Sequence, residues 1–292
     1  MRKVEAAEPP RTVATLLGQP QVEMALTCLG SLLRYSAQPL QLRIHDDGTL
    51  TPDDLARLGQ GLSCPEIVPR NEADARVEEV LARRPALQAF RRGNPLALKL
   101  IDVVVHAGVD DLAYCDSDVL FLRPFSGLFQ PRQPEAGAIF LSDRQNAYSV
   151  RSWHLLRHRR LVLPCRINTG VLQFRTWHFD PDLLEWYFSR PEFSFAPVWA
   201  EQTAWALLGQ RAGCRLWSSR QLRLPLPYQK EPGDAVALHF VSPLRSLLPR
   251  VLERAADRTG EPPVWLETVP ARRCRVWNLA WTEARRRMRR RA

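Results

Sequence analysis

The sequence predicts an α/β protein with a mixed central sheet flanked by helices, and three observations lead to this fold class. Apolar strand-like segments alternate with amphipathic helical segments through the first half of the chain, an order typical of parallel strands with helices packed on them. The second half has further strand-like segments in a less regular order, so mixed topology is expected there. With 292 residues, of which 45% are hydrophobic and 25% charged, the chain can bury one large core.

The first half alternates strands and helices from its beginning. The helix after the first strand shows the clearest period, because its apolar residues recur every three and four positions. The second strand alternates apolar and polar residues and ends in the turn Asp46-Asp47-Gly48, after which Thr51-Pro52 predicts a helix start. Strands are expected at residues 12–17, 40–46, 64–69 and 111–118, and helices at 19–36, 51–58, 73–84 and 94–108.

The second half is expected to complete a single domain. Strands are expected at residues 137–143, 167–175 and 234–241, and helices at 180–188 and 200–209. From about Arg250 the hydrophobic period is lost and the composition becomes rich in proline and arginine. The expected organisation is therefore a flexible N-terminus over 1–11, one domain over 12–250, and an appendage with a mobile basic tail over 251–292.

The positive charge is concentrated in that tail. The formal net charge is +10, but the segment ARRRMRRRA at residues 284–292 supplies six arginines, and without them the charge falls to +4. The body shows no basic stripe with interleaved aromatic residues, so a nucleic-acid partner is not expected. The tail is instead expected to contact anionic lipid head groups at a membrane surface.

The composition also bears on the compartment. No run of apolar residues is long enough for a membrane-spanning helix. A secretory signal has an apolar stretch after its basic residues, and the start MRKVEAAEPPRTV lacks one. The six cysteines show no CxxC or Cys/His spacing, which predicts reduced and mostly buried thiols rather than disulfides or a zinc module. We therefore expect a cytoplasmic protein, peripheral at the inner membrane surface where the tail makes contact.

Two acidic pairs lie where predicted strands end, and this is where open α/β sheets bind ligands. The pair Asp46-Asp47 precedes a glycine, so a solvated turn explains it as well as a ligand site does. The segment YCDSDVLFLR is harder to explain as a turn, because Asp116 and Asp118 interrupt apolar structure and would face the same way on a regular strand. Buried like charges are costly unless a cation lies between them, and carboxylate oxygens suit Mg²⁺ or Mn²⁺.

The segment YCDSDVLFLRPFSGLF resembles the DxD segment of GT-A glycosyltransferases, and the order of the surrounding features is similar to glycosyltransferase family 8 and its bacterial relatives. A helix with Lys99 precedes the DxD, and the strand GAIFLSD after it ends at Asp143. The later features are the Asn-x-Gly strand INTGVLQF, the pair Glu201-Gln202 before a helix, and the strand with His239 followed by Arg245 in HFVSPLR. The likeness covers most of the chain, and it implies the Rossmann-like GT-A fold of nucleotide-diphospho-sugar transferases.

The resemblance also implies roles for single residues. Asp116, Asp118 and His239 would bind Mn²⁺ or Mg²⁺, and Asp116 would also meet the nucleotide. The remaining donor contacts would come from Asp46 or Asp47 for the base or ribose, Lys99 and Arg245 for the diphosphate, and Asp143, Asn168, Gly170 and Gln202 for the sugar. The catalytic positions would be Glu201, Gln202 and Asp143. Two departures from the family pattern are Ser242, where the His-containing motif usually has glycine, and Glu201, where an aspartate is usual.

The implied reaction moves a sugar from a nucleotide-diphosphate donor, in the first place a UDP-sugar, to a hydroxyl group of a glycan, lipid or protein. The resemblance favours retention of configuration, whereas inversion would need Glu201 or Asp143 as a base at the acceptor hydroxyl. Residues 144–164 are expected to form part of the acceptor site, because acceptor pockets are built from loops.

Other interpretations remain open on the residues alone. His239 could be a core histidine, Asn168 turn chemistry, Lys99 a helix residue with its charge at the surface, Glu201 a first-turn helix acid, and Arg245 a solvated loop charge. A nucleotidyltransferase would share the α/β half, although the turn LLGQPQ is poor for cradling a triphosphate. A non-catalytic nucleotide-sugar or nucleic-acid binding protein is the third alternative.

Overall fold

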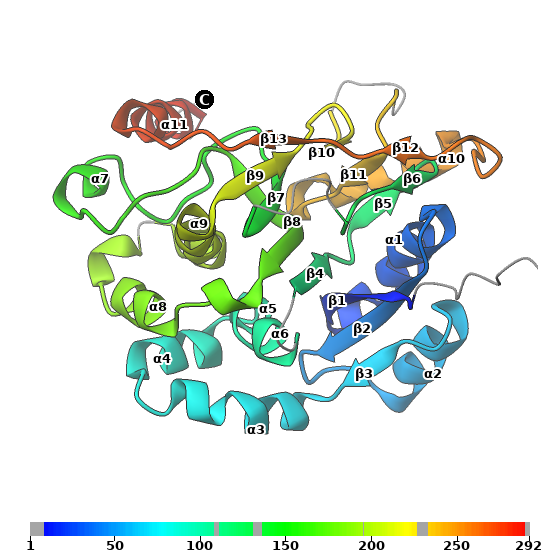
Figure 1. Cartoon of the computed structure of the whole chain (residues 1–292), viewed down its shortest axis with the longest axis horizontal. Coiled ribbons are helices and arrows are strands. Elements are labelled where there is room, and N and C mark those ends of the chain that lie inside the picture. The colour runs from blue at the N-terminus through cyan, green and yellow to red at the C-terminus, as the bar shows by residue number, and fades with distance from the viewer. Residues whose placement is uncertain (1–8, 108–110, 131–135, 195, 227–232, 290–292) are drawn as a thin grey trace, which may run out of the picture.

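The computed structural model describes residues 9–107, 111–130, 136–194, 196–226 and 233–289. Its centre is an eight-stranded mixed sheet with the strand order β13-β9-β7-β8-β4-β1-β2-β3, flanked by helices as the sequence predicts (Figure 1). The strands of this sheet are β1 (Arg11–Leu17), β2 (Leu40–Asp46), β3 (Glu66–Val68), β4 (Asp111–Cys115), β7 (Ala138–Ser142), β8 (Ile167–Arg175), β9 (Cys214–Trp217) and β13 (Thr268–Pro270).

Strands β1, β2, β3 and β4 are parallel to one another, and β8 runs antiparallel to both of its neighbours, β4 and β7. The carboxyl ends of β4 and β7 therefore lie at the same edge as the amino end of β8. Side chains that follow β4 and β7 meet side chains that begin β8 at this edge.

Helices cover both faces of the sheet, and each face has its own core. One core joins apolar residues of α3 to α6, α8 and α9, and the other joins α1, α2 and the two smaller sheets. The helices are α1 (Val22–Tyr35), α2 (Pro52–Gly61), α3 (Arg70–Leu81), α4 (Pro85–Gly93), α5 (Leu96–Leu100), α6 (Asp102–His106), α7 (His154–Arg157), α8 (Pro181–Phe188), α9 (Ala200–Ala212), α10 (Leu248–Arg254) and α11 (Val276–Arg289).

Two small sheets extend the second face. A three-stranded sheet has the order β10-β11-β5, and β12 pairs with β6. The bounds are β5 (Val119–Phe121), β6 (Phe125–Ser126), β10 (Leu222–Arg223), β11 (Ala237–His239) and β12 (Val264–Trp265). These strands are too short for a sequence period, and only β11 lies in a segment that the sequence predicts as a strand.

Three expectations about elements were wrong. The helix expected at 94–108 is divided into α5 and α6 at Ile101, a β-branched residue that does not favour a helix. The strand expected at 111–118 ends at Cys115, and the chain then enters a different sheet as β5. The basic tail, expected to be mobile, is helical as far as Arg289.

The expected domain boundary at residue 250 falls inside α10. Beyond it, β13 forms an edge of the main sheet and β12 pairs with β6. At the other end, β1 begins at Arg11, while residues 1–8 of the expected flexible N-terminus lie outside the described residues. The division into a domain and an appendage stays a prediction.

The cysteines were expected to be mostly buried, but only half of them are. All six cysteines are free, and three of them are buried. In the described ranges, no helix combines the length and the apolar stretch that crossing a bilayer requires.

Candidate functional site

The DxD segment forms the turn that carries the chain from the main sheet into the three-stranded sheet. β4 ends at Cys115, and the Asp116 N–H donates a hydrogen bond of 2.7 Å to the carbonyl oxygen of Gly170 in β8. β5 begins directly after Asp118 and pairs antiparallel with β11, which places His239 opposite Val119. The turn therefore brings two carboxylates of one segment beside a histidine that is more than a hundred residues away in the sequence.

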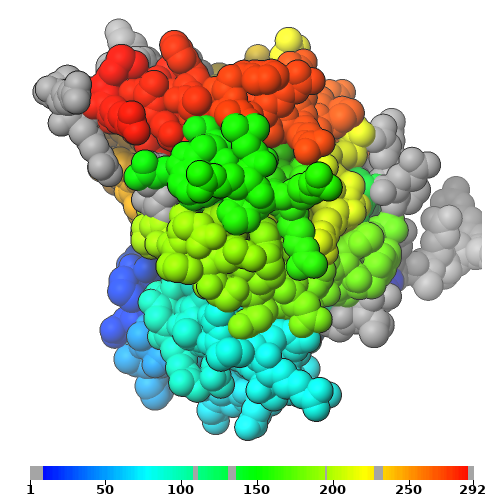
Figure 2. Space-filling view, turned by 90° about the vertical axis from the view of Figure 1, so that its left-hand side faces the viewer, coloured from blue at the N-terminus to red at the C-terminus, as the bar shows by residue number. Residues whose placement is uncertain are grey.

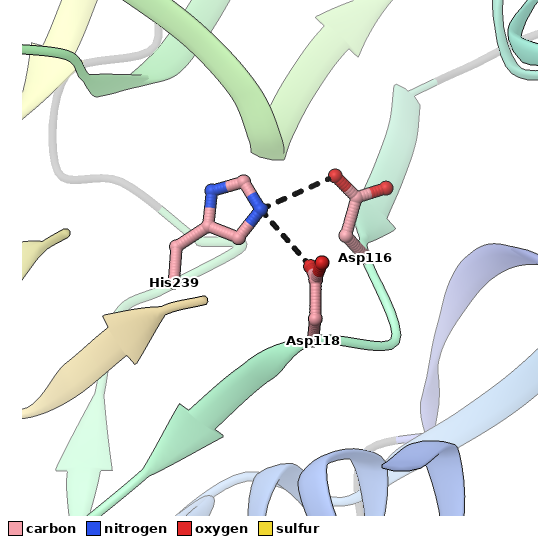
Figure 3. A group of neighbouring side chains, drawn as sticks. All are labelled: Asp116, Asp118 and His239. Atoms are coloured by element: carbon pink, nitrogen blue, oxygen red, sulfur yellow. Dashed lines mark ion pairs between the residues drawn. The ribbon is translucent and has the colours of Figure 1, made fainter. Parts of the chain in front are cut away.

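The three side chains point toward one another (Figure 3). His239 Nε2 lies 3.0 Å from Asp118 Oδ1 and 3.6 Å from Asp116 Oδ2. One ligand atom from each residue lies within 4.8 Å of the others, as a shared metal ion requires. These are the three residues that the family resemblance implies as metal ligands, and that role stays a prediction.

Asn168 determines which nitrogen of His239 faces the carboxylates. Its Oδ1 accepts the Gly170 N–H at 2.9 Å and lies 2.9 Å from His239 Nδ1, while its Nδ2 donates to Asp143 Oδ2 at 3.3 Å. Because the amide oxygen only accepts, His239 Nδ1 carries a proton and Nε2 is the nitrogen directed at the two carboxylates. A hydrogen-bond partner that fixes the ring of a metal-binding histidine in this way is usual in proteins.

The donor set fits a hard divalent cation. Asp118 Oδ1 is buried, and among the described residues it receives no well-aligned hydrogen bond, even though His239 Nε2 lies close to it. Burial acts to lower the pKa of His239, but the Asp118 carboxylate raises it overall. A proton on Nε2 or a cation can each compensate the buried acids, and two carboxylates with one imidazole suit Mn²⁺ or Mg²⁺.

Each carboxylate also has its own basic partner. Lys99 Nζ lies 2.9 and 3.0 Å from the two oxygens of Asp116, and the Lys99 side chain is only 3% exposed. Arg245 donates to Asp118 Oδ2 from Nε at 3.1 Å and from Nη2 at 2.8 Å, and its side chain is 41% exposed. Lys99 is therefore a buried counter-ion of Asp116, whereas Arg245 lies at the solvent-exposed rim of the cluster, where a ligand could reach it.

Gly170 is needed for the approach of His239. A Cβ atom at this position would lie 2.2 Å from His239 Cε1, which is far inside van der Waals contact. The Asn-x-Gly strand therefore has two functions: Asn168 orients the imidazole and Gly170 leaves room for it.

Glu201 is connected to the cluster through the hydroxyl group of Thr169. Thr169 accepts a hydrogen bond from Lys99 Nζ at 3.3 Å and donates one to Glu201 Oε2 at 3.3 Å. Glu201 is 4% exposed, and burial raises its pKa to about 7, although Lys99 acts in the opposite direction. Burial likewise raises the pKa of Asp143 above its ordinary value, against the hydrogen bonds that it accepts.

Sequence reasoning missed two residues of this cluster, Tyr114 and Thr169. The Tyr114 hydroxyl donates to Asp116 Oδ1 at 2.7 Å, and Lys99 Nζ lies 4.5 Å from the centre of its ring. The signal for Tyr114 was its position two residues before Asp116, which places both side chains on one side of the strand. Thr169 lies inside the NTG motif, but nothing in the sequence shows that its hydroxyl bridges Lys99 and Glu201.

Within the described parts of the chain, no contact links three of the expected site residues to the cluster. Gln202 Nε2 donates to the carbonyl oxygen of Ala147 at 2.9 Å. Asp46 Oδ1 accepts the N–H of Gly48 at 2.8 Å, and Asp47 Oδ1 accepts the Thr49 hydroxyl at 2.6 Å. This is the turn chemistry that the sequence allows for the first acidic pair, and its role toward a nucleotide stays a prediction.

Comparisons with known proteins identify the fold. No protein-family model matches the chain, and no curated protein matches it. Among solved structures, mouse xyloside xylosyltransferase 1 in its apo form is similar with a TM-score of 0.56 at 12% identity, covering 81% of this chain and 99% of that one. The glycosyltransferase GlyE of Streptococcus pneumoniae is similar with a TM-score of 0.50 at 11% identity, covering 87% of this chain and 62% of that one. The likeness shows that the chain has the GT-A fold of glycosyltransferases.

Proposed function

We propose that the protein is a metal-dependent glycosyltransferase, of the kind found in glycosyltransferase family 8, that moves a sugar from a nucleotide-diphosphate donor to a hydroxyl acceptor. The observation that carries this proposal is the cluster of Asp116, Asp118 and His239 at the carboxyl edge of a GT-A sheet. A UDP-sugar is the first donor to test. The similarity to a xylosyltransferase fold supports the class of reaction, and it leaves the sugar open.

The cluster would hold Mn²⁺ or Mg²⁺ through Asp116, Asp118 and His239. When bound, the ion would neutralise the negative charge that develops on the departing diphosphate. Arg245 would add a positive charge at the rim, because its exposed guanidinium can leave Asp118 for a phosphate. Lys99 is held by Asp116 and Thr169, so its main effect on the diphosphate would be to fix the position of Asp116.

The donor sugar would lie against the start of β8. Asp143 and Asn168 are hydrogen-bonded to each other there and present polar atoms for sugar hydroxyls. Glu201 is buried behind Thr169, so we propose that it acts on the site through Lys99 and Thr169. A buried Glu201 is unsuited to act as an inverting base, which must reach the acceptor hydroxyl itself. Inversion would therefore depend on Asp143 alone, and we propose retention.

The acceptor would be a hydroxyl group of a glycan, lipid or protein, held in part by residues 144–164. A cytoplasmic location with contact to the membrane surface is part of the proposal and rests on the basic C-terminal segment.

Calorimetric titration of UDP tests the proposal. We expect binding with Mn²⁺ that disappears with EDTA and falls at least about tenfold in Asp118→Asn, because the isosteric amide removes the ligand charge. Asp111→Asn is the matched control: it changes the acid that begins β4, at the opposite end of that strand from the DxD turn, and its metal-dependent affinity should equal that of the wild type.

GDP is titrated next if UDP does not bind. Absence of metal-dependent binding for both nucleotides would overturn the proposal and favour a protein without a nucleotide-sugar site. Equal affinities of the wild type and Asp118→Asn for the metal-bound nucleotide would overturn the assignment of the metal ligands.

A further inference from the structure

The helix α11 has a packed face that holds it on the body of the protein. Leu279 and Thr282 are buried, at 2% and 7% exposure. Glu283 Oε1 accepts the N–H of Ser152 at 2.6 Å, and the Arg286 guanidinium lies 3.4 Å from the centre of the Trp199 ring. These contacts fix the rotation of the helix about its own axis.

The opposite face of α11 exposes large apolar side chains to solvent. Trp277 and Trp281 are each 60% exposed, and Met288 is 58% exposed. At about 100° of rotation per residue, these three point within about 40° of one another and directly away from Leu279. An outward apolar stripe on a helix that is already packed on its other side indicates a binding surface for another molecule or for a membrane.

Positive charge borders this stripe. Arg285 and Arg287 lie to either side of it on the helix, and the guanidinium groups of Arg275 and Arg285 lie 4.9 and 5.1 Å from the rings of Trp277 and Trp281. Residues 271–292 contain nine arginines and a single acid, Glu283. That acid faces the body through its bond to Ser152, so the outward side of the helix carries only positive charge.

The segment lies along one face of the molecule. Figure 2 shows the red C-terminal segment beside the green segment that contains α7. In that neighbour, Leu156 is 72% exposed and Trp153 is 40% exposed with the Arg157 guanidinium 4.8 Å from its ring. The same combination of exposed apolar side chains and arginine therefore occurs on two adjacent segments.

We propose that α11 docks the protein onto an anionic lipid surface, with Trp277, Trp281 and Met288 entering the boundary between head groups and acyl chains. Tryptophan prefers this boundary, because its ring is apolar and its N–H is polar. Arginines beside the stripe match the phosphate groups of anionic lipids. The charge alone would fit any polyanion, and the apolar stripe at its centre is what selects a lipid surface.

Co-sedimentation with vesicles tests this docking. The full chain is mixed with vesicles of phosphatidylcholine or of phosphatidylcholine and phosphatidylglycerol (about 7:3) at about 0.15 M salt. We expect binding to the anionic vesicles only. The combined variant Trp277→Ser, Trp281→Ser and Met288→Ser should bind about tenfold more weakly or not at all, because the apolar area that enters the boundary is lost.

A single tryptophan elsewhere provides the matched control. Trp177 is 59% exposed, and Arg175 lies 5.1 Å from its ring, but it follows the far end of β8. Trp281→Ser should weaken vesicle binding several-fold, whereas Trp177→Ser should leave it unchanged. The melting temperatures of all variants should match that of the wild type, since the substituted side chains point into solvent.

Four results would overturn the proposal. These are no binding of the wild type to anionic vesicles, full binding by the triple variant, equal losses for Trp177→Ser and Trp281→Ser, and a lipid-free dimer in sedimentation velocity that the triple variant abolishes. The last result would assign the stripe to a second copy of the chain. This docking rests on the membrane contact included in the proposed function. None of the measurements involves a nucleotide, so their outcome is distinguishable from that of the proposed transferase activity.

Discussion

The buried carboxyl group of Glu201 makes the stability of this fold depend on pH. Burial raises its pKa to about 7, from an ordinary value of 4.5. Below pH 4.5 both the folded and the unfolded chain bind the proton. Between pH 4.5 and 7 the unfolded chain releases it and the folded chain keeps it, so the free energy of unfolding falls as the pH rises. The full loss above pH 7 is about 3 kcal/mol.

The variant Glu201→Gln should remove this dependence, because an amide does not ionise. In urea unfolding with EDTA, the variant should gain about 3 kcal/mol relative to the wild type when the pH is raised from 4 to 8. Glu253→Gln, on the surface of α10, is the control for the substitution itself. A difference between wild type and Glu201→Gln that stays constant with pH would contradict the buried, proton-binding state of this acid.

At the scale of residues, the sequence predicts which three side chains come together better than it predicts the groups that support them. Hard-ligand chemistry points to Asp116 and Asp118, and the motif order of the resembling family adds His239; their role as metal ligands is part of the proposal. Tyr114 and Thr169 were missed because a hydroxyl group has no sequence signature for the partner it will reach across the fold. The metal ligands need a particular chemistry, whereas their supports need only a position in space.

A buried ion pair joins the two helices on either side of α5, the helix that carries Lys99. Arg91 lies near the end of α4, and Asp102 lies at the start of α6. Arg91 Nε donates a hydrogen bond of 2.9 Å to Asp102 Oδ2, and α5 with Lys99 lies between the two residues in the chain. Arg91 also bonds to Asp74 in α3. The Asp102 side chain is 2% exposed and that of Asp74 is 49% exposed, so the two bonds to one arginine lie in different environments.

Removing the buried acid should therefore cost more than removing the exposed one. Asp102→Ala leaves Arg91 buried without its inner partner and should lower the free energy of unfolding by about 3 kcal/mol or more. Asp74→Ala should cost about 1 kcal/mol or less, because water can replace the lost carboxylate. Urea unfolding of the two variants under the same conditions measures the difference, and equal costs would show that the pair at Asp102 is not effectively buried.

At the scale of elements, periodicity predicted the amphipathic helices and failed where all sides of a segment are alike. Residues around Ile101 are buried on every side, so their apolar run could not reveal the break between α5 and α6. The helix α11 was not predicted, for a different reason. Trp277, Trp281 and Met288 add an apolar stripe opposite the packed face, which hides the single-face period that marks an ordinary surface helix.

At the scale of the whole molecule, the segment after α10 adds an edge strand to the main sheet and a second strand to the two-stranded sheet. β13 pairs with β9 at one edge of the main sheet, and β12 pairs with β6. Leu266 and Leu279 are each only 2% exposed and belong to different cores on the two faces. A sequence period could not reveal this, because two- and three-residue strands are fixed by long-range pairing rather than by local pattern.

Removing residues 255–292 tests whether this segment is an appendage. Burial of a leucine contributes about 1.5 to 3 kcal/mol, so the loss of Leu266 and Leu279 alone removes a large share of a typical stability of about 5 to 15 kcal/mol. We expect the shortened chain to lose cooperative unfolding in urea or to aggregate. Deletion of residues 284–292 keeps both leucines and β13, and it should unfold cooperatively near the wild-type midpoint. A chain ending at Arg254 that unfolds at the wild-type midpoint would instead establish the domain boundary near residue 250 that the composition predicts, because the two cores would then be complete without the strands and helix that follow.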